Sequence, residues 1–116
     1  MKPVRKYPRI SCNLPASIVF PEGNLLPIKS TATQLGQGGC LLQTKDLFGT
    51  NRPFMLELEI RNAVVRLVAR VLYEYAFSDS TYVGVEFINS EDAPVVLMDY
   101  IESMITENAI WKVEHN

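Results

Sequence analysis

The sequence predicts a mainly β domain, in which six short antiparallel strands form a small barrel or sandwich and one C-terminal α-helix follows. Three observations support this fold class. Apolar and polar residues alternate with a period of two in the middle of the chain, turn residues separate these stretches, and a helical spacing replaces the alternation after residue 90. The length of 116 residues, 47% of them apolar, fits one folded domain.

Three strands show the alternation clearly, in residues 54–60, 64–75 and 82–88. The apolar stripes expected to face the core are Phe54, Leu56, Leu58 and Ile60, then Val65, Leu67, Ala69, Val71, Tyr73 and Tyr75, then Val83, Val85 and Phe87. The opposite faces are expected to lie in solvent and carry Glu57, Glu59, Arg66, Arg70, Glu74 and Glu86. Weaker strands are expected near residues 16–20, 25–35 and 40–44, and Gly, Pro, Asn and Asp mark the turns between strands.

A helix of about three turns is expected to start between residues 90 and 95. The apolar residues Leu97, Ile101, Met104 and Ile105 follow a helical spacing. Ser90 or Asp92 is expected to cap its start, and Pro94 is tolerated only in the first turn. We interpret this helix as a lid on the barrel, with Ile110-Trp111 covering a barrel end or a neighbouring subunit.

Composition and residue types argue against several functions. No apolar run approaches the length of a membrane helix and no signal-peptide core follows the basic start, so a cytoplasmic protein is expected. Cys12 and Cys40 lack metal-type spacing and are interpreted as buried or half-buried thiols. The single histidine, His115, cannot complete a catalytic triad, so we expect no enzyme, no metal and no cofactor. The oligomeric state stays open and includes a homodimer.

Positive charge gathers at the N-terminus. Lys2, Arg5, Lys6 and Arg9 all precede the first acidic residue, Glu22. Pro3 and Pro8 disfavour a helix there, because each ring removes a backbone donor and fixes φ. We therefore interpret residues 1–13 as an extended basic arm and residues 14–116 as the barrel with its helix. The strand pair Arg66 and Arg70 repeats the Arg-x-x-x-Arg spacing, and we interpret it as part of a solvated face.

Glycines gather between two predicted strands, in residues 34–42 (QLGQGGCLL). Gly36, Gly38 and Gly39 leave backbone exposed where a side chain would block close approach. From these residues alone, a glycine-rich hairpin and a binding turn are about equally well supported.

Taken together, these segments resemble a PilZ domain over nearly the whole chain. The matching features are the N-terminal Arg5-Lys6-Tyr7-Pro8-Arg9 before Leu14-Pro15-Ala16, the segment Gly38-Gly39-Cys40-Leu41-Leu42 after the glycine turn, and Val83-Gly84-Val85-Glu86-Phe87 before the acidic helix start. The resemblance implies a six-stranded antiparallel split barrel with a C-terminal helix.

The resemblance also implies a ligand, the bacterial second messenger cyclic di-GMP. In the family, arginines of the first motif hold phosphates and guanines, and polar residues of the second motif hold a guanine. Carried over to this chain, the implied ligand residues are Arg5, Lys6, Arg9, Gln34, Gly36, Gly38 and Gly39. A guanidinium suits this role because it donates in pairs to phosphate oxygens and to the O6/N7 edge of guanine. A downstream protein partner, unidentified by the sequence, is implied as well.

The second motif departs from the family pattern Asp/Asn-x-Ser-x-x-Gly. Gln34 replaces the Asp or Asn, and Gly36 replaces the Ser. An alternative register over residues 31–36 keeps a hydroxyl at Thr33 but loses the match that follows it. Two alternatives to ligand binding therefore stay open. One is a PilZ domain that serves only as a protein-interaction module, and the other, less favoured because of the net charge of −2, is a barrel that binds single-stranded nucleic acid.

Overall fold

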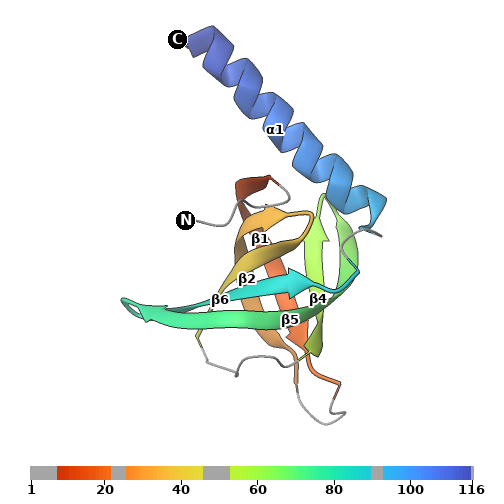
Figure 1. Cartoon of the computed structure of the whole chain (residues 1–116), viewed down its shortest axis with the longest axis vertical. Helices are drawn as coiled ribbons and strands as arrows, with labels where there is room; N and C mark the ends of the chain where they lie inside the picture. Colours follow the sequence, from red (N-terminus) through yellow and green to blue (C-terminus); the bar gives the residue numbers. More distant parts are fainter. Residues whose placement is uncertain (1–7, 22–25, 46–52, 90–92, 116) are drawn as a thin grey trace, which may run out of the picture.

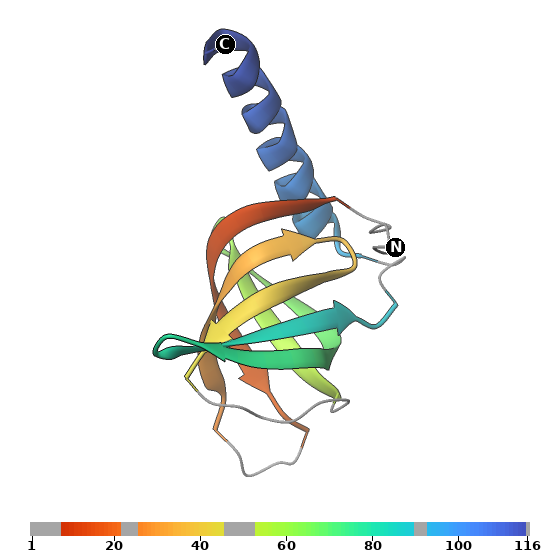
Figure 2. The same cartoon turned by 60° about the vertical axis from the view of Figure 1, so that its left-hand side comes forward.

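The structure is a computed structural model that describes residues 8–21, 26–45, 53–89 and 93–115, with the side chains of the last segment described as far as Glu107. Its elements are β1 (Arg9–Val19), β2 (Ile28–Gly36), β3 (Gly39–Thr44), β4 (Pro53–Ile60), β5 (Ala63–Phe77), β6 (Ser80–Phe87) and α1 (Val95–His115). The strands form a closed antiparallel barrel in the order β1-β2-β3-β6-β5-β4, with β1 also paired to β4 (Figures 1 and 2). The predicted six-stranded barrel with a C-terminal helix is confirmed.

The first strand starts earlier than the sequence indicated. β1 begins at Arg9, so residues 9–13 of the predicted basic arm belong to the barrel wall. Lys2, Arg5 and Lys6 lie outside the described residues. Arg9 is consequently held by strand pairing, whereas residues 1–7 of the arm lie outside the described residues.

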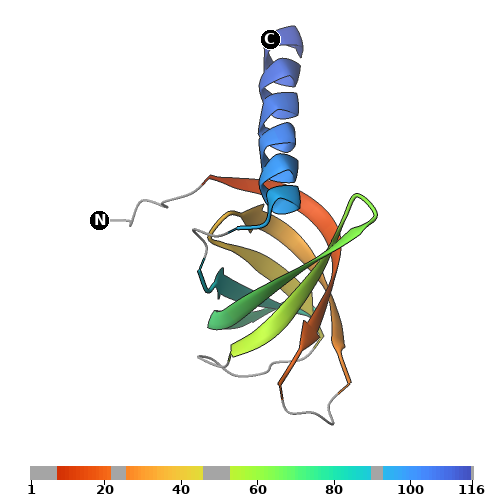
Figure 3. The same cartoon turned by 90° about the vertical axis from the view of Figure 1, so that its right-hand side faces the viewer.

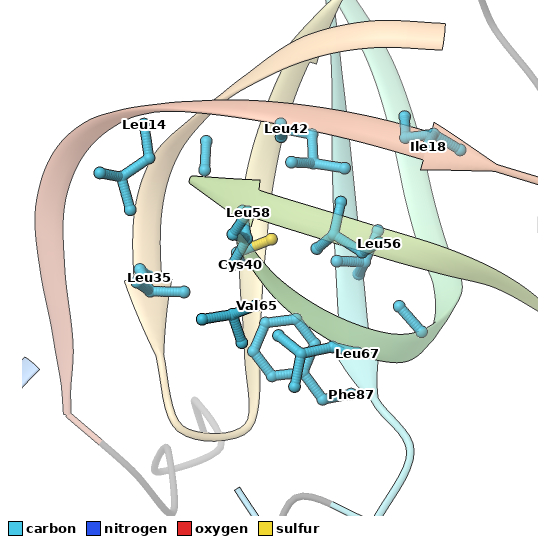
Figure 4. Packing of buried hydrophobic residues seen from close by; sticks show 14 of the residues in the cluster. Leu14, Ile18, Leu35, Cys40, Leu42, Leu56, Leu58, Val65, Leu67 and Phe87 are labelled. Carbon is cyan, nitrogen blue, oxygen red and sulfur yellow. The ribbon is translucent and has the colours of Figure 1, made fainter. Parts of the chain in front are cut away.

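The barrel interior is filled by side chains from alternate positions of all six strands (Figure 4). All four predicted core residues of β4, together with Val65, Leu67, Ala69 and Val71 of β5 and Val83, Val85 and Phe87 of β6, are buried. Cys40 is buried and Cys12 half-buried, and both thiols are free, as predicted. Burial raises the pKa of Cys12 to about 11, so this thiol stays protonated near neutral pH.

Part of the prediction for β5 is wrong, because Tyr73 and Tyr75 are not in the core. They are 43% and 45% exposed. The register of β5 against β6 shifts between Val71, which faces Val85, and Tyr73, which faces Gly84. Leu72 is therefore the extra residue of a β-bulge, and beyond a bulge the odd positions move to the other face of the strand.

The helix covers one end of the barrel, as predicted, and then continues past it. Leu97 and Ile101 are buried in the core, and Met104 packs against it, whereas Ile105 is 40% exposed. α1 begins within the predicted window, but its 21 residues exceed the three turns expected. No Gly or Pro follows Pro94, so the sequence contains no helix-breaking residue there. Figure 3 shows the second half of the helix projecting from the barrel.

The tight turn between β4 and β5 contacts the helix. Arg61 and Asn62 connect β4 to β5, and their φ angles of 49° and 68° are typical of a type I′ hairpin turn. The Arg61 guanidinium lies 5.4 Å from the centre of the Tyr100 ring on α1, a cation–π contact. The predicted caps Ser90 and Asp92, and the side chains of Ile110 and Trp111, lie outside what the structure describes. Within the described part of the chain, no helix is long and apolar enough to span a membrane.

Candidate ligand-binding site

Pairing of β1 with β2 brings three of the predicted ligand residues onto one face of the barrel. Arg9 lies opposite Gly36, and Ser11 lies opposite Gln34. The intervening pair, Ile10 and Leu35, points into the core and is buried. Because side chains alternate along a strand, Arg9, Gln34 and Gly36 share the outer face. The sequence alone did not place these residues together, since 25 positions separate Arg9 from Gln34.

Gly36 allows the start of β1 to lie close against β2. A Cβ atom at this position would be 2.8 Å from the backbone oxygen of Pro8 and 3.3 Å from Cγ of Arg9. The stem of Arg9 therefore passes directly over Gly36, which explains why this outward-facing glycine is buried. A glycine at the family's serine position thus replaces a side-chain hydroxyl with a close contact to the backbone of the N-terminal segment.

Gly38 and Gly39 form the turn into β3 and join it to β6. The backbone oxygen of Gly38 accepts a hydrogen bond of 2.9 Å from the backbone N–H of Phe87. Gly39 lies opposite Glu86, and a Cβ atom on it would collide with the backbone oxygen of Val85. Packing of β3 against β6 is therefore enough to require glycine at position 39, independently of any ligand.

The guanidinium groups of the two Arg-x-x-x-Arg pairs differ in their partners. Arg66 donates to Glu57 at 2.8 Å, and Arg70 donates through Nε to Glu86 at 2.7 Å, both on the exposed outer face. These ion pairs support the interpretation of Arg66 and Arg70 as a solvated face. Arg9 makes no ion pair or side-chain hydrogen bond with any residue that the structure describes. Among Arg9, Arg66 and Arg70, Arg9 is therefore the one whose guanidinium donors are not used by another described residue.

A groove separates this face from the helix. It has a volume of about 260 Å³ and is lined by Pro8 and Gln37 on the barrel side and by Met98, Ile105 and neighbouring residues on the side of α1. Pro8 directly precedes Arg9, and Gln37 directly follows Gly36. The candidate site and the first half of α1 therefore share a boundary.

A second surface, which the sequence did not predict, lies on the hairpin of β5 and β6. Tyr73, Tyr75 and Tyr82 form a stacked row, with ring centres 6.2 and 5.3 Å apart. The ring of Tyr73 covers Gly84. A Cβ atom at position 84 would collide with this ring unless the ring moved. The sequence feature that points to this surface is the glycine in the middle of an otherwise apolar strand, because such a glycine marks close approach.

Among the described residues, no group of three or more His, Cys, Asp or Glu side chains could hold a metal ion. The site therefore consists of a cationic side chain, an amide and a glycine-rich backbone on an outer barrel face. Such a set can bind an anionic planar ligand without reacting with it.

Comparison with protein families identifies the chain. The family model of the PilZ domain matches residues 3–105. This match includes the whole barrel and the packed half of the helix. The chain belongs to the PilZ domain family.

Solved structures with this PilZ fold include two from Escherichia coli and one from Bacillus subtilis. The PilZ domain of YcgR from E. coli, solved with c-di-GMP, is 16% identical, with a TM-score of 0.69 over 97% of this chain and 98% of that chain. The B. subtilis inhibitor of motility MotI/DgrA is 15% identical, with a TM-score of 0.72, and the match covers 90% of this chain and 51% of that chain. YcgR from E. coli in complex with c-di-GMP is also 15% identical, with a TM-score of 0.72, and the match covers 95% of this chain and 48% of that chain.

This PilZ domain thus spans about half the length of MotI/DgrA and of the longer YcgR chain. At these identities the likeness establishes the fold. No curated protein matches the sequence.

Proposed function

We propose that this PilZ domain binds cyclic di-GMP on the outer face of β1 and β2 and passes the signal to a protein partner. The observation that carries the proposal is the position of Arg9, which lies on the face shared with Gln34 and Gly36 and has no ion-pair partner among the described residues. The family and the two E. coli structures with c-di-GMP support the same ligand. The proposal includes a bacterial, cytoplasmic receptor without catalytic activity.

Each proposed ligand residue has a chemical role. Arg9, with Arg5 and Lys6 from the preceding segment, supplies cationic donors to the two phosphates, and an arginine also recognises the O6/N7 edge of guanine. Gln34 supplies an amide that donates and accepts hydrogen bonds at a guanine edge. Gly38, which is half-buried, contributes backbone that a ring can approach, whereas Gly36 and Gly39 allow Arg9 and β6 to lie close to the site.

The groove beside α1 allows a ligand at Arg9 to affect the helix. Pro8 lines this groove and is bonded to Arg9, so a ligand that repositions Arg9 also moves the wall facing Met98 and Ile105. We propose that the partner protein reads this change on α1. The resulting output is a changed surface, and no covalent step is needed.

Calorimetric titration of the purified chain with cyclic di-GMP tests the proposal. Heat of binding that fits a defined stoichiometry, and that is absent with cyclic di-AMP, is the expected result, because adenine carries an N6 amino donor where guanine has its O6 acceptor. A flat titration at ligand concentrations up to 1 mM, roughly the limit of weak recognition, would refute it.

Restoring the family motif gives a second, finer prediction. Gln34→Asp is expected to tighten binding by about tenfold, because a carboxylate accepts stronger hydrogen bonds than an amide. Gly36→Ser is expected to cancel part of this gain, because its Cβ would lie 2.8 Å from the oxygen of Pro8 and would displace Arg9. Titrations of the two single variants and the double variant separate these effects. Equal tightening by both substitutions would contradict the contact at Gly36.

A protein-interaction module without a ligand is the second candidate function. The observation that favours it is the exposed aromatic row on β5 and β6, together with Phe77, which is 69% exposed. Exposed rows of this kind also stack on bases in nucleic-acid-binding barrels. The charged groups beside Tyr73, however, are Arg70 paired with Glu86, and Glu74, so the surface offers little positive potential to a phosphate backbone. If the wild type, Arg9→Ala and the restored variant all gave flat titrations, the interaction module would be the better account.

A further inference from the structure

The outer segment of β5, residues 71–77, has an open edge. β4 pairs with β5 only as far as Pro53 and Arg70, and β5 continues beyond this pair to Phe77. Among the described residues, β6 is the one strand that pairs with the outer segment. Figure 1 shows the hairpin of β5 and β6 projecting from the side of the barrel. The side of the segment that faces away from β6 is therefore a strand edge.

The backbone of this edge is arranged for pairing with a further strand. A two-residue turn joins β5 to β6, so Phe77 and Ser80 form the hydrogen-bonded pair that closes the hairpin. Hydrogen-bonded and non-hydrogen-bonded pairs then alternate along the ladder, so the N–H and C=O of Ala76 point away from β6. From Val71 to Phe77 the sequence contains no Lys or Pro, the residues that commonly prevent pairing at an edge.

One face of the outer segment is aromatic. Tyr73, Tyr75 and Phe77 are alternate residues of the strand, and they are 43%, 45% and 69% exposed. Tyr82 of β6 extends the row, since its ring centre lies 5.3 Å from that of Tyr75. The three exposed side chains of β5 amount to roughly 300 Å² of accessible surface, which is the size of the largest apolar patches on many monomeric proteins. Patches of this size often bind a partner.

The edge is complementary to itself. Antiparallel pairing of two copies about a twofold axis at Tyr75 sets the two Tyr75 side chains opposite each other, and sets Tyr73 opposite Phe77 of the second copy. Each aromatic residue of the outer segment then has an aromatic partner on the same face. The two Tyr75 residues form a non-hydrogen-bonded pair, in which side chains come closest. A register centred on Glu74 would instead set two carboxylates opposite each other.

The charges at the ends of the contact agree with this register. Asp79, in the hairpin turn of one copy, comes beside Arg70 of the second copy, at the start of its open edge, and the twofold axis repeats this approach. The two aromatic faces together amount to roughly 600 Å², which is below the minimum of about 1,200 Å² for stable complexes. A reversible dimer is therefore expected rather than a permanent one.

We propose that two copies of this chain associate through the open edge of β5, in antiparallel pairing centred on Tyr75. The hairpins of the two copies then form one continuous four-stranded sheet. Because both copies use the same segment, the contact closes at two copies and does not extend into a filament. It involves none of Arg9, Gln34 and Gly36, so it does not depend on cyclic di-GMP binding.

Sedimentation velocity of the purified chain, without cyclic di-GMP, tests the association. A reversible shift from monomer to dimer is expected between about 5 and 500 µM, the range of a small and weak interface. Tyr75→Lys is expected to raise the dissociation constant at least about tenfold, because two ammonium groups would face each other at the twofold axis. The matched control is Val64→Lys, at an exposed residue of β5 that is paired with Glu59 of β4, and it should leave the dissociation constant unchanged.

Circular dichroism checks that both lysine variants keep the barrel. A wild-type chain that stays monomeric over the whole concentration range would overturn the proposal and leave the edge to a strand of a different protein. A dimer that Tyr75→Lys leaves intact would overturn it as well, because the contact would then lie elsewhere on the molecule.

Disulfide trapping with diamide tests the register. Tyr75→Cys is expected to give a cross-linked dimer, because Cα atoms of a non-hydrogen-bonded pair are about 4.5 Å apart, within the reach of a disulfide. Tyr73→Cys alone is expected not to cross-link, since its two copies lie four residues apart, or about 13 Å along the strands. A mixture of Tyr73→Cys and Phe77→Cys is expected to cross-link. The wild type, with Cys12 half-buried and Cys40 buried, gives the background. Equal cross-linking by all three variants would overturn the pairing centred on Tyr75.

Discussion

Arg9→Ala is expected to weaken cyclic di-GMP binding by about 10- to 150-fold. The substitution removes charge-assisted hydrogen bonds to phosphate, each worth about 1.5–3 kcal/mol, and 1.4 kcal/mol corresponds to a factor of ten. Arg5→Ala is expected to act in the same direction. Isothermal titration calorimetry measures the change, and circular dichroism checks that the barrel is intact, since Arg9 is the first residue of β1.

The matched control for this prediction is Arg66→Ala. Arg66 belongs to the second Arg-x-x-x-Arg pair, but it lies on a different part of the barrel and donates to Glu57. Its loss is expected to change ligand affinity by less than about tenfold, and to change stability little, because exposed ion pairs contribute about 0–1 kcal/mol. If Arg66→Ala were the more damaging change, the ligand site would have to be moved from β1 and β2 to β4 and β5.

Gly39→Ala is expected to lower the free energy of unfolding by about 3 kcal/mol or more, without ligand present. The added methyl group would meet the backbone oxygen of Val85, and a backbone atom in a paired strand cannot move aside without breaking the β3–β6 ladder. Urea denaturation followed by tryptophan fluorescence or circular dichroism gives the difference. A variant as stable as the wild type would contradict the close approach of β3 to β6.

Gly84→Ala provides a comparison at a glycine of the same barrel. Its Cβ would meet the ring of Tyr73, which is partly exposed and can rotate away, so a smaller loss of about 1 kcal/mol is expected. The two variants add the same methyl group. In Gly39→Ala the backbone of Val85 has to move, whereas in Gly84→Ala the side chain of Tyr73 has to move. Similar losses in both would indicate that the ring of Tyr73 is held as firmly as the backbone.

The sequence predicted the elements whose side chains follow a simple period. Phe54, Leu56 and Val85 face the core because alternation in a strand depends only on neighbouring residues. The same reasoning placed Tyr73 and Tyr75 in the core, which is wrong. In the sequence Leu72 looks like one more apolar residue, and its role as a bulge depends on the register of β5 against β6. The length of the helix was underestimated, although no Gly or Pro follows Pro94 to end it.

The candidate site was predictable in its residue types and not in its geometry. An arginine near a glycine turn suggests a phosphate ligand, but only the register of β1 and β2 shows that Arg9 faces Gly36. The same limit applies to Gly39, whose need for glycine arises from Val85, 46 positions further along the chain.

The single extra residue at Leu72 lets one strand carry two independent surfaces. Before it, alternate residues of β5 fill the core, and after it the same alternation presents tyrosines to solvent. The bulge absorbs one residue, while the pairs on either side of it, Val71 with Val85 and Tyr73 with Gly84, keep their places. Deletion of Leu72 is therefore expected to leave Tyr73 facing outward, directly after the inward-facing Val71, whereas a strand that kept Leu72 and lost the bulge would turn Tyr73 and Tyr75 inward. The pairing of β5 with β6, as much as the composition of the strand, thus specifies the outer chemistry of the domain.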